Sequence, residues 1–99
     1  MEYSEECVIA AAHPALPGHF PGQPVVPGVV LLEQVLRAAT RAGIAVPVCA
    51  LPQVKFIEPL LPAQPFTICL RSDRPGRLRF ECMREGRVFA SGLLQTEQP

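Results

Sequence analysis

The sequence predicts an α+β domain in which an antiparallel sheet of about five strands wraps around one helix. The chain has 99 residues, which is the size of one domain, because a second hydrophobic core would need roughly another 100 residues. A single segment has helical periodicity, whereas short runs of alternating apolar and polar residues fill most of the second half. One helix can cover its apolar face only against that sheet, so we expect a single domain over residues 1–99.

The helix is predicted over Val29–Ala42, where the chain contains neither proline nor glycine. Pro27 and Gly28 precede it, and proline is favoured in a first helical turn because its missing N–H is no loss there. Gly43 follows at the position of a C-terminal capping glycine. At about 100° per residue, apolar and polar side chains fill opposite arcs of this helix. The apolar arc contains Leu31, Leu32, Val35, Leu36, Ala38 and Ala39, and the polar arc contains Glu33, Gln34, Arg37, Thr40 and Arg41.

Four strands are predicted after the helix, where apolar residues recur at every second position. In one of them Leu78, Phe80 and Cys82 alternate with charged residues, so one sheet face is buried and the other is hydrated. A fifth strand is predicted before the helix, over Cys7–Ala12. The four later strands are Val48–Ile57, Phe66–Arg71, Arg77–Met83 and Val88–Gln95.

The charge of the chain argues against nucleic-acid binding, because nine basic residues balance nine acidic ones. The four cysteines form no C-x-x-C pair, so they indicate neither a zinc site nor a redox motif, and we expect reduced core residues. No apolar run approaches the roughly 20 residues that cross a bilayer, and Met1–Ala12 does not have the pattern of a leader. We therefore expect a cytoplasmic protein without membrane or nucleic-acid partners.

A segment rich in proline and glycine before the helix carries the strongest functional pattern. From Gly18 to Glu33 it reads G-H-F-P-G-Q-P-V-V-P-G-V-V-L-L-E. This run resembles the signature of the 3-hydroxyacyl-[acyl carrier protein] dehydratases of the FabZ/FabA type, which have the hotdog fold. The match has no gap over sixteen positions, and Val54-Lys55-Phe56 followed by Glu58-Pro59 resembles a later strand of the family. The resemblance implies a single hotdog domain.

The resemblance also implies a reaction and a role for each matched residue. The reaction is the loss of water from a 3-hydroxyacyl thioester, which gives the trans-2-enoyl thioester. His19 is expected to be the base that removes the C2 proton, since neutral imidazole is available at physiological pH. Glu33 is expected to protonate or orient the departing 3-hydroxyl. Gly28 is expected to offer its N–H to the enolate oxygen, with Phe20 and Val29 beside the substrate.

The implied reaction requires no metal and no organic cofactor, and its implied partner is an acyl carrier protein with a phosphopantetheine arm. Because carrier proteins are acidic, Arg77 and Arg79 in the basic C-terminal part are candidates for docking the carrier. Arginines that discourage strand edges from pairing explain the same pattern equally well. The small size favours a homodimer, and in the family the histidine of one subunit meets the carboxylate of the other.

The residues leave alternatives open. Glu33 and Arg37 form an i,i+4 pair, which is typical of a solvent-exposed helix face. Arg37 also stands where the family usually has glutamine, one turn after the carboxylate. A hotdog thioesterase would use a similar helix and carboxylate, and a non-catalytic subunit that binds the carrier or completes a heterodimer is a third alternative. Turnover of a 3-hydroxyacyl thioester, and the identity of its product, discriminates among the three.

Overall fold

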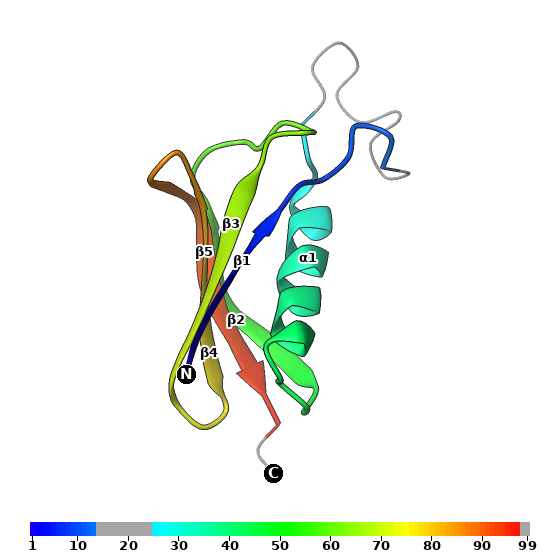
Figure 1. Ribbon diagram of the computed structural model, residues 1–99. Helices are drawn as coiled ribbons and strands as arrows, with labels where there is room; N and C mark the ends of the chain where they lie inside the picture. The colour runs from blue at the N-terminus through cyan, green and yellow to red at the C-terminus, as the bar shows by residue number, and fades with distance from the viewer. Residues whose placement is uncertain (14–24, 98–99) are drawn as a thin grey trace.

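The computed structural model describes residues 1–13 and 25–97, except the side chain of Asp73, and shows one helix across the inner face of a five-stranded sheet (Figure 1). The elements in chain order are β1 (Glu2–Cys7), α1 (Gly28–Arg41), β2 (Val48–Phe56), β3 (Phe66–Arg74), β4 (Arg77–Arg84) and β5 (Arg87–Thr96). The strand order is β1-β3-β4-β5-β2, with every neighbouring pair antiparallel. The predicted α+β architecture is therefore confirmed.

Helix α1 begins and ends where the prolines and glycines of the sequence indicate. Pro27 is the N-cap residue, and its carbonyl accepts hydrogen bonds from the third and fourth residues of the helix at 3.0 and 3.3 Å. At the other end Gly43 has a φ of 96°, a left-handed conformation that glycine adopts without strain. The N–H of Ile44 then bonds the carbonyl of Ala39 at 3.0 Å, as in a Schellman motif. The predicted helix bounds are correct to within one residue.

The core lies between one face of α1 and the inner face of the sheet. Its members alternate along the strands with side chains of the outer face, as the period of two requires. Burial of this apolar surface, at about 25 cal/mol per Å², is the main term that favours folding. The core contains Val30, Leu31, Val35, Ala38 and Ala39 of the helix and Phe66, Ile68, Leu70, Leu78, Phe80, Cys82, Phe89, Ala90 and Leu94 of the strands.

The cysteines do not all belong to this core, which corrects the expectation from the sequence. Cys82 is fully buried, and desolvation raises the pKa of its thiol to about 12. Cys7 and Cys69 are half-buried, and Cys49 is exposed. Cys49 lies on β2, which is an edge strand with exposed positions along most of its length. An edge strand buries less than a central one, so the apolar character of a cysteine does not decide its burial here.

The first strand also differs from the prediction, which placed it over Cys7–Ala12. Strand β1 spans Glu2–Cys7 and pairs with β3 at the other edge of the sheet. The apolar run that prompted the prediction leaves the sheet after Cys7. Ile9 is buried outside any strand, and its carbonyl accepts a hydrogen bond of 2.8 Å from the N–H of Ala63. The prediction was wrong because the actual strand is rich in glutamate and looks polar in sequence.

Glu5 takes a half-buried position on β1 because the helix supplies its partner. Tyr3, Glu5 and Cys7 are the half-buried positions of this strand. Arg41 donates two hydrogen bonds to the Glu5 carboxylate, at 2.9 and 2.7 Å, and the Tyr3 hydroxyl donates a third at 2.9 Å. The hydrogen bonds from Arg41, more than any other cause, lower the pKa of Glu5. This clamp ties the edge strand to the last turn of α1.

We expect Glu5→Gln to lower the stability of the protein in a pH-dependent way. The pKa of Glu5 is lowered by folding, so its contribution is present above its ordinary value of 4.5 and is lost as the pH falls through the folded value. Thermal melts of wild type and variant should therefore differ at neutral pH and converge in strongly acid solution. Glu6→Gln, on the exposed side of the same strand, is the control and should change little. A difference that does not depend on pH would contradict the clamp.

Gly92 fixes the approach of β2 to β5, and we expect Gly92→Ala to destabilise the fold. A Cβ atom at this position would overlap the backbone oxygen of Gln53 and the ring of Phe80. Both neighbours belong to the sheet and its core, so overpacking should cost about 1–3 kcal/mol in urea denaturation. Ser91→Ala, one residue away on the outer face, should cost about 0.5 kcal/mol or less. An equally stable Gly92→Ala protein would show that β2 lies farther from β5.

Candidate active site

An apolar pocket of about 400 Å³ lies where α1 begins. Its walls come from both layers of the fold, because the first helical turn faces the end of β2 and the start of β5 across it. Residues that line it include Val26, Gly28, Leu31, Phe56, Leu60 and Phe89. Phe89 is held edge-on against Phe66, with ring centroids 5.6 Å apart. The pocket therefore has a fixed, mainly hydrophobic wall on the sheet side.

Gly28 and Phe56 contact each other at this pocket. A Cβ atom on residue 28 would lie 2.7 Å from Cζ of Phe56, so the ring lies against the first helical turn only because that residue is glycine. Phe56 is 51% exposed although it faces the helix side of the sheet, opposite Ala90. Phe56 was not assigned a site role from the sequence, although it belongs to the V-K-F run quoted there.

The N–H groups of Gly28 and Val29 have no hydrogen-bond partner among the residues that the structure describes. They are the first two donors of α1, and the N-cap residue Pro27 makes no side-chain hydrogen bond to them. The positive end of the helix dipole lies at the same point. A negative charge that develops on a ligand oxygen in this pocket would therefore be stabilised, which is the chemistry of an oxyanion site.

Glu33 does not line this pocket. It comes five residues after Gly28, which places it about 7.5 Å farther along the axis and about 140° around the helix. Together with Val29 and Arg37 it forms a stripe on the exposed face of α1, where Val29 is 71% exposed. Nη2 of Arg37 lies 2.7 Å from Oε1 of Glu33. The i,i+4 pair expected from the sequence is therefore present, and the carboxylate points away from its own core.

The remaining candidate residues do not line this pocket as far as the structure describes them. His19 and Phe20 fall outside the described residues. Arg77 and Arg79 lie on the outer face of β4, away from the helix, and near the β3–β4 hairpin. In Figure 1 that hairpin lies at the opposite end of the sheet from the beginning of α1. One chain therefore brings Gly28 to the pocket but leaves the Val29 side chain on the exposed stripe, outside the pocket lining. Both residues are separated from the two arginines.

Sequence reasoning missed the sheet side of the pocket. Leu60 and Phe89 lie outside the motifs of the sequence. Phe89 is the extra residue at a register shift between β4 and β5. Such a bulge changes which side chains face the core. Glu58 also borders the pocket, where its carboxylate lies 3.2 Å from Nη2 of Arg87. The strand register, which no local pattern of the sequence shows, decides these positions.

A helix start that opens on an apolar pocket, within a sheet wrapped around one helix, defines a hotdog-fold protein. The model of the ApeI-like family, described as ApeI dehydratase, matches residues 2–93. The chain belongs to this family of dehydratases.

Curated relatives are similar over part of their length. The 3-hydroxyacyl-[acyl-carrier-protein] dehydratase FabZ of Bartonella quintana (strain Toulouse) is 32% identical over 88 residues, which cover 78% of this chain and 57% of the relative. FabZ of Chloroflexus aggregans (strain MD-66 / DSM 9485) is 38% identical over 42 residues, which cover 42% of this chain and 29% of the relative. The match to the first of them thus spans little more than half of its length.

Solved structures confirm the predicted hotdog fold. The dehydratase heterocomplex ApeI:P from Xenorhabdus doucetiae has a TM-score of 0.85 at 22% identity and covers 96% of this chain and 86% of its own. The gentisyl-coenzyme A thioesterase BH1999 has a TM-score of 0.67 at 18% identity, with 95% and 85% covered. At these identities the likeness concerns the fold. Among the residues described here, no helix has the length and apolar character needed to span a membrane.

We expect Gly28→Ala to impair dehydratase activity while the protein stays folded. The Phe56 ring is half-exposed and can turn aside, so the melting temperature should change little. Its displacement would change the pocket beside the helical N–H groups, and we expect at least about a tenfold fall in kcat/KM, which is roughly 1.4 kcal/mol of transition-state stabilisation. The double variant Gly28→Ala/Phe56→Ala removes the clash and should match Phe56→Ala alone. An activity loss that persists in the double variant would show that ring displacement is not its cause.

Proposed function

We propose that this protein removes water from a 3-hydroxyacyl thioester, carried by an acyl carrier protein, to give the trans-2-enoyl thioester. The observation that carries the proposal is the pair of N–H groups at the first turn of α1, those of Gly28 and Val29, which have no hydrogen-bond partner among the described residues, while Gly28 itself lines an apolar pocket. Such donors suit the thioester oxygen, and the apolar wall suits an acyl chain. The H-F-P-G run that contains His19 precedes this helix, and the FabZ relatives are named for this substrate class.

In the proposed reaction the imidazole of His19 takes the C2 proton, and the electron pair moves to the thioester oxygen as an enolate. The N–H of Gly28 donates a hydrogen bond to that oxygen, supported by the helix dipole. The enolate then reforms the carbonyl, the C2–C3 double bond forms, and the C3–O bond breaks. The carboxyl group of Glu33, released from Arg37 and carrying a proton, protonates the departing hydroxyl, which leaves as water. These steps use only side chains and the backbone of the chain.

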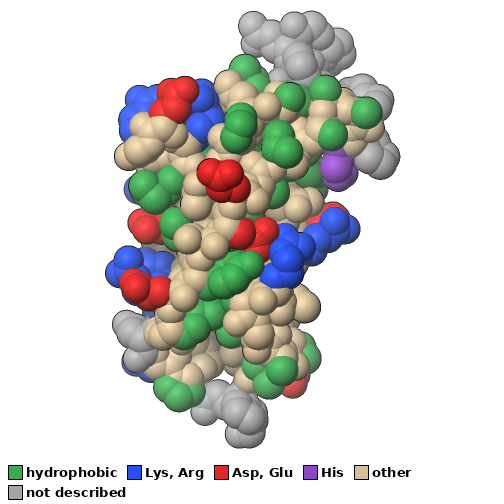
Figure 2. All heavy atoms as spheres, in the orientation of Figure 1, with side chains coloured by type: hydrophobic (Ala, Val, Ile, Leu, Met, Phe, Trp, Pro, Cys, Tyr) green, Lys and Arg blue, Asp and Glu red, His purple; other side chains and the backbone are tan. Residues whose placement is uncertain are grey.

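We propose further that the working unit is a homodimer with shared sites. Glu33 lies on a helix face turned away from its own pocket, so it suits a site that a second subunit completes. Exposed apolar side chains gather at the same end of the molecule, as Figure 2 shows near the start of α1. Val29 is 71% exposed, Phe56 and Ile57 are each 51% exposed, and Leu61 is 43% exposed. A two-fold interface there would cover this surface and give two identical sites.

The carrier is proposed to dock through basic side chains that include Arg77 and Arg79. Both extend from the hydrated face of β4, where the acidic surface of a carrier protein can approach them. Carrier docking is a separate property from the chemistry at Gly28, because the two regions lie at opposite ends of the sheet (Figure 1). A variant of these arginines that uses carrier-bound substrate less well can therefore keep an unaltered rate with small thioesters.

The shared site predicts complementation between inactive subunits. His19→Ala and Glu33→Gln should each lower the dehydration rate by at least about 10²-fold, the lower range for general acid–base catalysis. Mixing the two variants after subunit exchange should restore one intact site in each mixed dimer, which is up to about a quarter of wild-type activity. Persistent inactivity after proven exchange would mean that both residues act within one chain.

The identity of the product distinguishes dehydration from thioester hydrolysis. A dehydratase leaves the thioester intact and forms an enoyl group, whereas a thioesterase releases a free thiol and a hydroxy acid. The assay should therefore follow both enoyl formation and thiol release from one 3-hydroxyacyl thioester. Thiol release without enoyl formation would overturn the proposed function.

A further inference from the structure

Four arginines converge on the outer face of the sheet, at the end remote from the start of α1. Arg71 and Arg74 come from β3, and Arg77 and Arg79 come from β4. The strand register places Arg71 opposite Arg79 and Arg74 opposite Arg77. With Leu93 of β5 these four side chains line a pocket of about 330 Å³. We call them the arginine cluster.

The arginine cluster is electrostatically unfavourable without a counterion, because like charges at opposite positions destabilise a sheet. Among the described side chains only Glu2 pairs with it, 3.4 Å from Arg71, and both of these side chains are largely exposed. Arg74, Arg77 and Arg79 form no ion pair with any described side chain. The two cross-strand arginine pairs therefore receive little neutralisation from the side chains that the structure describes.

The β4–β5 hairpin shows how the same chain neutralises such a pair elsewhere. Arg84 and Arg87 are also register partners. There, however, Arg84 lies 3.2 Å from Glu85 and Arg87 lies 3.2 Å from Glu58. Among the described side chains, opposed arginines thus have acidic partners at the β4–β5 hairpin, whereas Arg74, Arg77 and Arg79 have none. We infer from this difference that the arginine cluster can accept a counterion from outside the chain.

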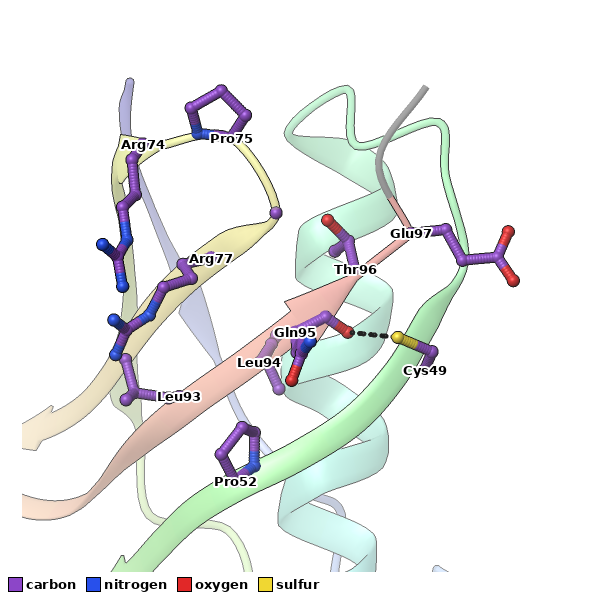
Figure 3. A pocket seen from close by; sticks show the side chains of 11 residues that line it. Cys49, Pro52, Arg74, Pro75, Arg77, Leu93, Leu94, Gln95, Thr96 and Glu97 are labelled. Carbon is purple, nitrogen blue, oxygen red and sulfur yellow. Dashed lines mark hydrogen bonds between the residues drawn. The ribbon is translucent and has the colours of Figure 1, made fainter.

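The backbone that carries the cluster is fixed before any ligand arrives. The Ser72 hydroxyl donates a hydrogen bond shared between the carbonyls of Arg74 and Arg77, at 3.0 and 2.8 Å. The N–H of Thr96 bonds the carbonyl of Gly76 at 3.0 Å and so ties the hairpin to β5. In Figure 3 the side chains of Arg74 and Arg77 extend the same way from the hairpin, on the side where Leu93 lies. The guanidinium donors therefore extend from a backbone that is already held in place when a ligand binds.

A second pocket, of about 940 Å³, adjoins the cluster and shares Arg74, Arg77 and Leu93 with it. It continues past Pro52 and Gln95 of the neighbouring strands (Figure 3). An anionic group held by the arginines would therefore have room beside it for an attached organic body.

We propose that the arginine cluster binds the phosphate group of an organic phosphate ester. A carboxylate offers two oxygens and one charge, whereas a phosphate offers three oxygens and up to two charges to guanidinium forks. Four arginines in opposed pairs match a phosphate group better than a carboxylate, and the adjoining pocket holds the rest of the ester. The ester is either a free small molecule or the phosphopantetheine arm of a carrier protein. The proposal does not depend on the dehydration reaction, since binding is measured without turnover.

The test is calorimetric titration of the whole protein with inorganic phosphate and with pyrophosphate, at ionic strength held constant with sodium chloride. Saturable binding is expected for both anions, and tighter binding for pyrophosphate. Arg74→Gln/Arg77→Gln should weaken the binding of either anion by at least about tenfold, because each lost guanidinium group removes charge-assisted hydrogen bonds. The matched control is Arg84→Gln/Arg87→Gln, which removes the same charge from an opposed pair and should change binding less than about twofold. No saturable binding, or an equal loss in the control, would overturn the proposal.

Thermal melts provide a readout that a folding defect cannot imitate. Without anion, Arg74→Gln/Arg77→Gln should melt at or above the wild-type temperature, because it removes repulsion. Pyrophosphate should raise the melting temperature of wild type and not that of this variant. A variant that melts well below wild type and is stabilised equally by pyrophosphate would contradict the site.

The source of the phosphate is distinguished with carrier protein prepared with and without its phosphopantetheine arm. Tighter binding of the armed carrier, lost in Arg74→Gln/Arg77→Gln, would identify the arm as the ligand. Equal binding of the two carriers, with pyrophosphate binding retained, would identify a free phosphate ester.

Discussion

The packing of one face of α1 against the inner face of the sheet is the constraint on which the rest of the structure depends. Val35 and Ala38 are fully buried at the centre of that contact. Once they face the sheet, the 3.6-residue period turns Val29 and Glu33 outward. The single layer of strands packs on the other side of the helix, so no described strand covers that outer stripe. The candidate site is therefore divided between an inner pocket and an exposed carboxylate by the geometry of one helix.

The same constraint determines the character of the outer sheet face. Because α1, the one helix among the described residues, is on the inner side, side chains that alternate with the core residues remain in contact with water. Arginines can occupy such positions at small cost when each has an acidic neighbour, as Arg87 has in Glu58. Where no such neighbour is described, as at Arg77 and Arg79, positive charge accumulates on a rigid surface. That surface is shaped by strand register rather than by any local sequence motif.

The elements that the sequence predicted well are those with local causes. The helix follows from Pro27, Gly43 and a 3.6-residue period, and the four later strands follow from alternation between turn residues. Strand β1 could not be predicted in this way, because the place of Glu5 depends on Arg41, 36 residues away. The pocket shows the same division. Gly28 was found from the contiguous motif, whereas Phe89 belongs to the pocket only through a register shift.

The turn at the start of α1 explains why so short a motif is informative. Three consecutive residues there satisfy three separate structural requirements. The carbonyl of Pro27 accepts the first hydrogen bonds of the helix, Gly28 leaves room for the Phe56 ring, and Val29 is exposed on the outer face. Each requirement restricts the residue type at its own position. The combination of residues is therefore rare by chance and can be recognised in the sequence alone. The aromatic wall that faces this turn requires only a surface of the right shape, and several side chains from distant strands can provide that shape. The residues of this wall can therefore be recognised only in the assembled sheet.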